Sequence, residues 1–97
     1  PNTKNKNGST PLYQASKNGN TKTARLLLQF KADPNTKNKY GSTPLHKASM
    51  NGYVDISRLL LQFKADPNTK NKNGITPLHV SSNPEMKHLL ESNMQVE

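Results

Sequence analysis

The sequence repeats itself every 33 residues, and this period constrains the fold more than any other feature. The tripeptide Thr-Pro-Leu starts at Thr10, Thr43 and Thr76, PNTKNK occurs three times at the same spacing, and LLLQFKAD occurs twice. A fixed period of this size is typical of stacked supersecondary units, none of which buries its apolar face alone. The 97-residue chain, with 30% hydrophobic residues, is therefore predicted to form one small domain with a thin, elongated core.

The second copy indicates how one unit folds. Thr43 is a favourable helix N-cap and Pro44 suits the first helical position. Asn51-Gly52 is typical of a helix end at which left-handed residues reverse the chain. An apolar stripe at helical spacing then follows, formed by Ile56, Leu59, Leu60 and Phe63. The pattern predicts a short helix, a turn and a longer antiparallel helix in which the leucine triplets, Phe30 and Phe63 pack in the core.

The segment that leads to the next Thr-Pro-Leu is predicted to project as a hairpin-like loop. Between Asp66 and Gly74 it contains Pro67 and the pair Asn73-Gly74, which is a strong signal for a tight turn. In the preceding loop, Asn35 is expected to form loop hydrogen bonds.

Residues 41–68, GSTPLHKASMNGYVDISRLLLQFKADPN, resemble an ankyrin repeat and match the pattern G-x-TPLH-x-A, NG, LLL, AD-x-N. The resemblance covers essentially the whole chain. It implies an all-α ankyrin-repeat solenoid of stacked helix-turn-helix units with projecting β-turn or hairpin loops, and a role in protein–protein binding without catalysis. The predicted units are repeat 1 (1–33), repeat 2 (34–66) and repeat 3 (67–97), the last a shortened C-terminal cap.

Repeats 1 and 2 depart from the family pattern at two kinds of position. Tyr13 stands where the family has histidine, which removes imidazole hydrogen bonds to the Thr-Pro-Leu threonine and the neighbouring loop. Lys31 and Lys64 stand where the family has glycine after the second helix. A lysine held in the left-handed conformation of glycine costs about 1 kcal/mol, so either this strain is present or the turn differs.

Repeat 3 has a three-residue deletion that removes the Asn-Gly turn, since Leu78 and Leu89 are 11 positions apart whereas Leu45 and Leu59 are 14 apart. Asn83-Pro84-Glu85 instead supplies an N-cap, a proline for the first helical position and a first-turn acid. Glu91 and Asn93 replace Leu61 and Phe63, so the last helix is more polar and the SNMQVE end is predicted to be solvated. At the other end the chain opens at Pro1 in the middle of the motif, and we expect the intact protein to carry further ankyrin repeats before it.

The histidines and threonines of the motif are interpreted as structural. The resemblance implies that His46 and His79 stabilise the fold, and His88 has no second ligand nearby. The threonines of Thr-Pro-Leu are interpreted as helix caps. The sequence contains no Ser-His-Asp set, paired carboxylates or glycine-rich phosphate loop at a workable spacing. No enzyme activity, cofactor or metal site is predicted.

The chain carries 14 basic and 6 acidic residues, a formal charge of +8, which favours acidic proteins, nucleic acid or anionic lipid as neighbours. Twelve of the basic residues are lysine, a hydrated point charge that suits general attraction better than bidentate phosphate or base recognition. Stacking predicts two lysine columns on the projecting loops. They are Lys4, Lys37 and Lys70, and Lys6, Lys39 and Lys72. The columns either steer an acidic partner or are a solvated by-product of repeat duplication.

Residues that differ between the copies offer more specific contacts. Tyr40, Met50 and Ile75 replace polar or charged residues of the sister copies, and we expect an apolar island among lysines on the concave face of loops and first helices. The predicted partner-binding residues are Lys4, Lys6, Lys17, Lys37, Lys39, Tyr40, Ser42, Met50, Asn51, Lys70, Lys72 and Ile75. Tyr40 and Met50 are expected to anchor a protein partner that the lysines attract.

Two alternatives to an acidic or mixed-surface protein partner stay open at this point. The lysine columns could bind a polyanion such as nucleic acid or acidic lipid headgroups, although no nucleic-acid motif is present. The domain could also serve only to space or stabilise neighbouring domains. The longest apolar run is three leucines, so no membrane span is predicted, and no cysteine is present. The expected location is intracellular and cytoplasmic, or a host cell if the protein is a pathogen effector.

Overall fold

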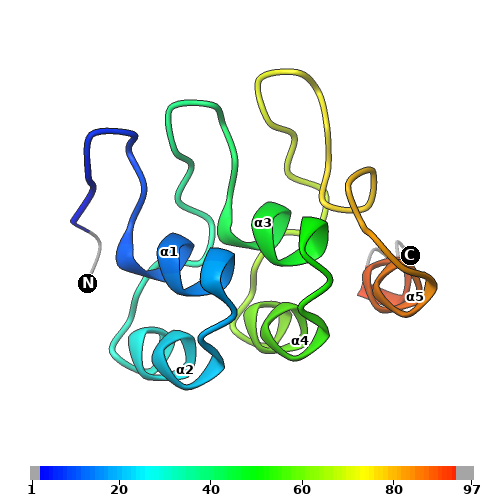
Figure 1. Cartoon of the computed structure of the whole chain (residues 1–97), viewed down its shortest axis with the longest axis horizontal. Coiled ribbons are helices and arrows are strands. Elements are labelled where there is room, and N and C mark those ends of the chain that lie inside the picture. Colours follow the sequence, from blue (N-terminus) through cyan, green and yellow to red (C-terminus); the bar gives the residue numbers. More distant parts are fainter. Residues whose placement is uncertain (1–2, 94–97) are drawn as a thin grey trace.

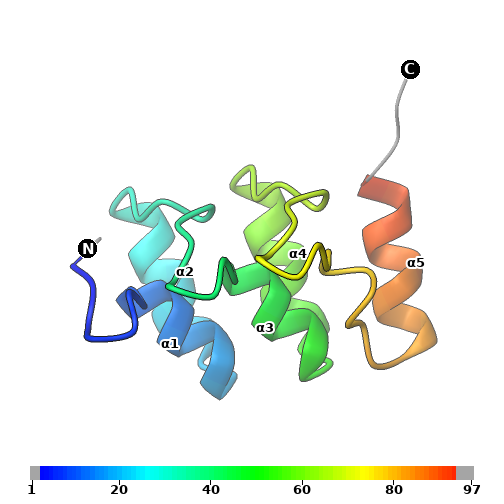
Figure 2. The ribbon, with the colours of Figure 1, turned by 90° about the horizontal axis from the view of Figure 1, so that it is seen from above.

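A computed structural model of the chain describes residues 3–93 and contains five α-helices in that part. The helices are α1 (Pro11–Asn18), α2 (Thr21–Gln29), α3 (Pro44–Met50), α4 (Val54–Gln62) and α5 (Pro84–Asn93). Helices α1 and α2 form one antiparallel pair, α3 and α4 form the next, and α5 packs on α4 (Figure 1). Seen from above, the units follow one another along a single axis (Figure 2). The predicted solenoid of helix-turn-helix units is confirmed.

The first helix of each complete unit begins at the predicted cap. The Thr10 side-chain oxygen accepts a hydrogen bond from the Tyr13 backbone N–H at 3.2 Å, and Thr43 accepts one from the His46 N–H at 3.3 Å. These bonds satisfy backbone donors that the helix itself leaves unpaired. At the end of α3 the prediction was partly wrong, because Asn51 keeps right-handed backbone angles and Gly52 alone is left-handed, with φ of 74°.

One hydrophobic cluster runs from α1 through α4 to α5. Leu12, Leu45 and Leu60 are fully buried in it, and small residues such as Ala15 and Ala48 allow the helices to approach closely. Each unit therefore buries its apolar face against the next unit, as the repeat period predicts.

The expectation that the whole apolar stripe of repeat 1 is buried was wrong. Phe30 is 71% exposed and Leu26 is 51% exposed, whereas Leu59, the counterpart of Leu26 in repeat 2, is 3% exposed. Phe63, the counterpart of Phe30, is partly buried against the core. Helix α4 packs on α2, but within residues 3–93 no helix packs on the other side of α2, so the same residue types stay in solvent there.

Three hairpin-like loops project on the side of α1 and α3, as Figure 1 shows. We name them finger 1 (residues 3–9), finger 2 (36–42) and finger 3 (69–75). The fingers are joined by backbone hydrogen bonds, from the Lys39 N–H to the Asn7 carbonyl at 2.9 Å and from the Lys72 N–H to the Tyr40 carbonyl at 3.1 Å. The predicted projecting loops are confirmed, and they form a continuous bonded row.

The third unit is reduced in its first helix. Where the Thr-Pro-Leu helix would begin, residues 77–80 form only tight turns, with hydrogen bonds such as that from the Val80 N–H to the Pro77 carbonyl. The second helix, α5, begins as predicted, because the Asn83 side chain accepts from the Met86 N–H at 2.8 Å. Met86 and Leu90 are buried. The ends of the chain for which predictions were made, residues 1–2 and 94–97, lie outside the described residues.

Lys31 and Lys64 both adopt the left-handed conformation, with φ of 74° and 76°. The turn is therefore the one that glycine would form, and the strain is present. Lys31→Gly and Lys64→Gly are each expected to raise the free energy of unfolding by about 1 kcal/mol, because glycine has no Cβ to clash in this region. Urea titration measures the change. Lys31→Ala is the control, since it removes the charge and keeps the strain; equal stability of the Ala and Gly variants would refute the prediction.

Candidate functional site

Each finger is shaped by an asparagine side chain that caps its tip. In finger 2 the Asn38 side-chain oxygen accepts from the backbone N–H groups of Tyr40 and Ser42, at 2.9 and 3.0 Å. Asn5 and Asn71 form the same pair of bonds in fingers 1 and 3. Sequence reasoning missed this role, although an asparagine three residues before a repeated glycine is a recognisable turn signal. These bonds fix the backbone turn at each tip, beside which the finger lysines lie.

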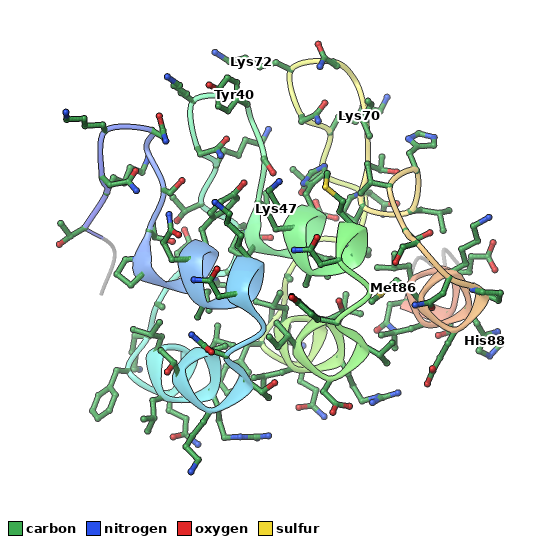
Figure 3. All side chains as sticks on the ribbon, in the orientation of Figure 1. Tyr40, Lys47, Lys70, Lys72, Met86 and His88 are labelled. Atoms are coloured by element: carbon green, nitrogen blue, oxygen red, sulfur yellow. The ribbon has the colours of Figure 1, made fainter. Side chains whose placement is uncertain are left out.

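The finger lysines of the two predicted columns are exposed. The structure brings Lys37 and Lys70 together, since the Lys37 ammonium donates to the Lys70 carbonyl oxygen at 3.4 Å. The Lys39 ammonium lies 5.2 Å from the centroid of the Tyr40 ring, within the range of a cation–π contact. Lys72 lies at the tip of finger 3, and Tyr40 at that of finger 2 (Figure 3).

Charge is unevenly distributed over the fold. We define the finger face as the three fingers together with α1 and α3. It carries eight lysines and no acidic residue, and these lysines are Lys4, Lys6, Lys17, Lys37, Lys39, Lys47, Lys70 and Lys72. The rest of the sequence has six basic and six acidic residues, which cancel. The whole formal charge of +8 therefore belongs to the finger face.

The residues predicted to form an apolar island differ in exposure. Tyr40 is 60% exposed and Met50 is 44% exposed, so both present large apolar surface to a partner. Ile75 is half-buried and so presents less apolar surface, and its carbonyl oxygen accepts a hydrogen bond from His46. Met50 lies at the end of α3, where its sulfur accepts from the Lys47 ammonium at 3.8 Å.

Two other predicted contact residues have roles within the fold. The Asn51 side-chain amide donates to the Lys17 carbonyl oxygen at 3.0 Å and so ties the turn of repeat 2 to the end of α1. The Ser42 N–H is bound by the Asn38 side chain, and its carbonyl accepts from the Asn38 N–H. Asn35 also has a role within the fold, because its side-chain amide donates to the Lys64 carbonyl oxygen and its side-chain oxygen accepts from the Asp66 N–H. Its expected loop role is confirmed.

His46 links α3 to the next finger. Its Nδ1 accepts from the Thr43 backbone N–H at 3.2 Å, so the proton lies on Nε2, which donates to the Ile75 carbonyl oxygen at 2.7 Å. Burial lowers the pKa of His46, the hydrogen bond to Ile75 opposes this effect, and the charge of Lys37 lowers the pKa further. The imidazole therefore has a structural role, as the resemblance implied, and burial favours its neutral form.

The domain is expected to lose stability as the pH falls below about 6.5, the ordinary histidine pKa. Since the pKa of His46 is lower in the folded than in the unfolded chain, the unfolded chain binds more protons in this range. The stabilisation is complete above the unfolded pKa and is lost progressively toward the folded one. Urea unfolding between about pH 7.5 and 5.5 measures it. His46→Gln should flatten the dependence; a slope equal to that of the unmodified chain would contradict this account.

Within residues 3–93 no group of three or more His, Asp or Glu side chains is placed to hold a metal ion. His88 lies exposed on α5, on the side away from α4, while Met86 points toward α4 (Figure 3). None of the helices in this part of the chain has the length and apolar character needed to cross a membrane.

Comparison with known proteins adds one finding. The family model described as ankyrin repeats (3 copies) matches residues 1–71, which include both complete helix pairs and the first residues of finger 3. The shortened unit after finger 3 lies beyond the match. A search of curated proteins returned no match for the chain.

Proposed function

This chain belongs to the ankyrin-repeat family, and we propose that it is a non-enzymatic scaffold that binds an acidic or mixed-surface protein through its finger face. Ankyrin repeats are generally protein–protein interaction modules. The family alone leaves the partner and the binding face open, so the proposal on both rests on the residues of this chain.

The observation that carries the proposal is the confinement of the whole net charge to the finger face. A surface with eight lysines and no acid attracts a negatively charged partner over roughly the Debye length of 10 Å at 0.1 M salt. Such attraction raises the association rate more than it slows dissociation. Lysine supplies little desolvated contact area, so tight binding also needs apolar anchors.

Tyr40 and Met50 are the anchors that we propose. Both are large, apolar and open, and each is placed beside a lysine of the same face, Tyr40 beside Lys39 and Met50 beside Lys47. Burial of an aromatic side chain at the centre of an interface contributes more than the surrounding polar contacts. The lysines would therefore orient the partner, and the two apolar side chains would hold it.

Replacing both Tyr40 and Met50 by alanine is expected to weaken the complex at least about tenfold, mainly through faster dissociation. Calorimetry or surface plasmon resonance with a captured partner measures the loss. Leu26→Ala with Phe30→Ala is the matched control, because it removes two exposed apolar side chains from the opposite layer. Binding that survives Tyr40→Ala with Met50→Ala would exclude these anchors.

A polyanion remains the alternative ligand, favoured by the adjacent lysines of fingers 2 and 3. Against it, the finger face has no arginine, and Tyr40 is its one exposed aromatic side chain within the described residues. Titration with random-sequence RNA and DNA separates the two ligands. Micromolar binding that persists at about 0.15 M salt would replace the protein partner by nucleic acid.

A further inference from the structure

We propose that a cavity between the first two repeats seats the carboxylate side chain of one Asp or Glu of the partner. The cavity has a volume of about 220 Å³, and repeat 1 contributes Tyr13 and Lys17 while repeat 2 contributes Asn38, Tyr40 and Lys47. The inference rests on the proposed function and names the group that the finger face would recognise.

The size of the cavity suits one side chain. Pockets for drug-sized molecules and cofactors range from about 300 to 1,000 Å³. At 220 Å³ this cavity is below that range, yet it holds the space of several waters, each of which takes about 30 Å³ in the liquid. A carboxylate at the end of an Asp or Glu side chain fits a space of this size.

The chemistry of the lining selects an anion. Lys17 and Lys47 are both basic residues in the last turns of their helices, α1 and α3, and no acidic residue lines the cavity. The contact that Lys47 makes is with the Met50 sulfur at 3.8 Å, a weak acceptor that leaves ammonium hydrogens for a stronger one. The lining also includes the tyrosines Tyr13 and Tyr40, whose phenolic groups can donate hydrogen bonds.

Repeat duplication does not account for this set of residues. At the equivalent places one repeat further along, Met50 replaces Lys17, Val80 replaces Lys47 and His46 replaces Tyr13. The site between repeats 2 and 3 thus lacks both lysines, and its histidine is bound to the Ile75 carbonyl. Unlike the finger lysines, which are identical in all three copies, the two cavity lysines come together at one inter-repeat position.

The proposal commits to a carboxylate on a protein. Lysine binds an anion as a point charge, whereas the bidentate forks that favour phosphate come from arginine, which is absent from the lining. Tyr40 lines the cavity and is 60% exposed, so a partner segment whose neighbouring residue packs on that ring would place its acid in the cavity.

The test is an NMR titration of the ¹⁵N-labelled domain with an oligoglutamate peptide, with an oligoglutamine peptide and with inorganic phosphate. Oligoglutamate is expected to shift the signals of Tyr13, Lys17, Tyr40 and Lys47, and oligoglutamine is not. Lys17→Met with Lys47→Val, the residues of the later repeats, should weaken binding about tenfold, because the variant removes both ammonium groups that line the cavity. Lys22→Met with Lys87→Val removes the same charge elsewhere and should change little.

If both double variants weakened oligoglutamate binding equally, the cavity inference would be wrong. General attraction of acidic proteins to the finger face would still hold. Shifts with phosphate but not with oligoglutamate would overturn the carboxylate assignment. If neither peptide binds while a captured partner still depends on Tyr40 and Met50, the cavity inference fails and the proposed function stands.

Discussion

Leu59→Ala is expected to lower the free energy of unfolding by about 2–5 kcal/mol, the cost of removing a buried leucine and leaving a cavity. Leu59 is 3% exposed and lies on α4 beside α2, where it lines the same hollow as Arg25 of α2. Domains of this size have small margins of stability, so the variant should unfold at much lower urea concentration, or be unfolded without urea. Circular dichroism against urea measures the midpoint.

The chain offers its own control for this prediction. Leu26 occupies the same place in repeat 1 as Leu59 in repeat 2 and is 51% exposed. Leu26→Ala should therefore cost less than about 1 kcal/mol, because an exposed leucine loses little transfer free energy on truncation. Similar losses for the two variants would mean that α2 and α4 do not stack as described.

Gly41→Ala is expected to destabilise the domain by about 2–5 kcal/mol, since two penalties combine. Gly41 has φ of 77°, which costs a residue with a Cβ about 1–2 kcal/mol. A Cβ would also lie 2.8 Å from the Lys72 backbone nitrogen of the next finger, and such overpacking costs about 1–3 kcal/mol. The variant should also separate fingers 2 and 3, which faster amide exchange at Lys72 would report.

Gly74→Ala is the matched control for Gly41→Ala. Gly74 has the same φ of 77°, but a Cβ there meets no atom within 4 Å. Gly74→Ala should therefore cost only the backbone strain of a positive φ. This cost is about 1 kcal/mol, because alanine also lowers the conformational entropy of the unfolded chain and so offsets part of the strain. If Gly41→Ala were no worse than Gly74→Ala, the close contact between the fingers would be refuted.

The sequence was sufficient for the architecture because the repeat encodes it locally. In repeats 1 and 2 the threonine and proline of the motif start α1 and α3, and Gly19 and Gly52 reverse the chain after them, so cap chemistry and spacing predicted α1 to α4 without knowledge of distant contacts. The apolar stripe predicted which side of each helix is buried. It could not show that Phe30 lies in solvent, because its exposure depends on whether another unit packs on α2.

The candidate site was less predictable because it forms between repeats. The two lysine columns were predicted from the 33-residue period, and the structure places Lys37 beside Lys70 accordingly. The period did not predict that Lys17 and Lys47 line the same cavity, since these residues occupy different positions in their repeats. Likewise, the composition of finger 2 indicated a lysine-rich loop, whereas the shape of its tip depends on the two hydrogen bonds that the Asn38 side chain accepts.

The most direct test of the central claim, that the finger face binds an acidic protein, compares two charge variants as bait in affinity capture. Lys4→Gln, Lys37→Gln and Lys70→Gln neutralise one finger column, while Lys22→Gln, Arg25→Gln and Lys87→Gln remove the same charge from the second-helix side. We predict that the partner held by the unmodified chain is retained by the second-helix variant and lost by the finger variant. Equal retention, or equal loss, in the two variants would contradict the account.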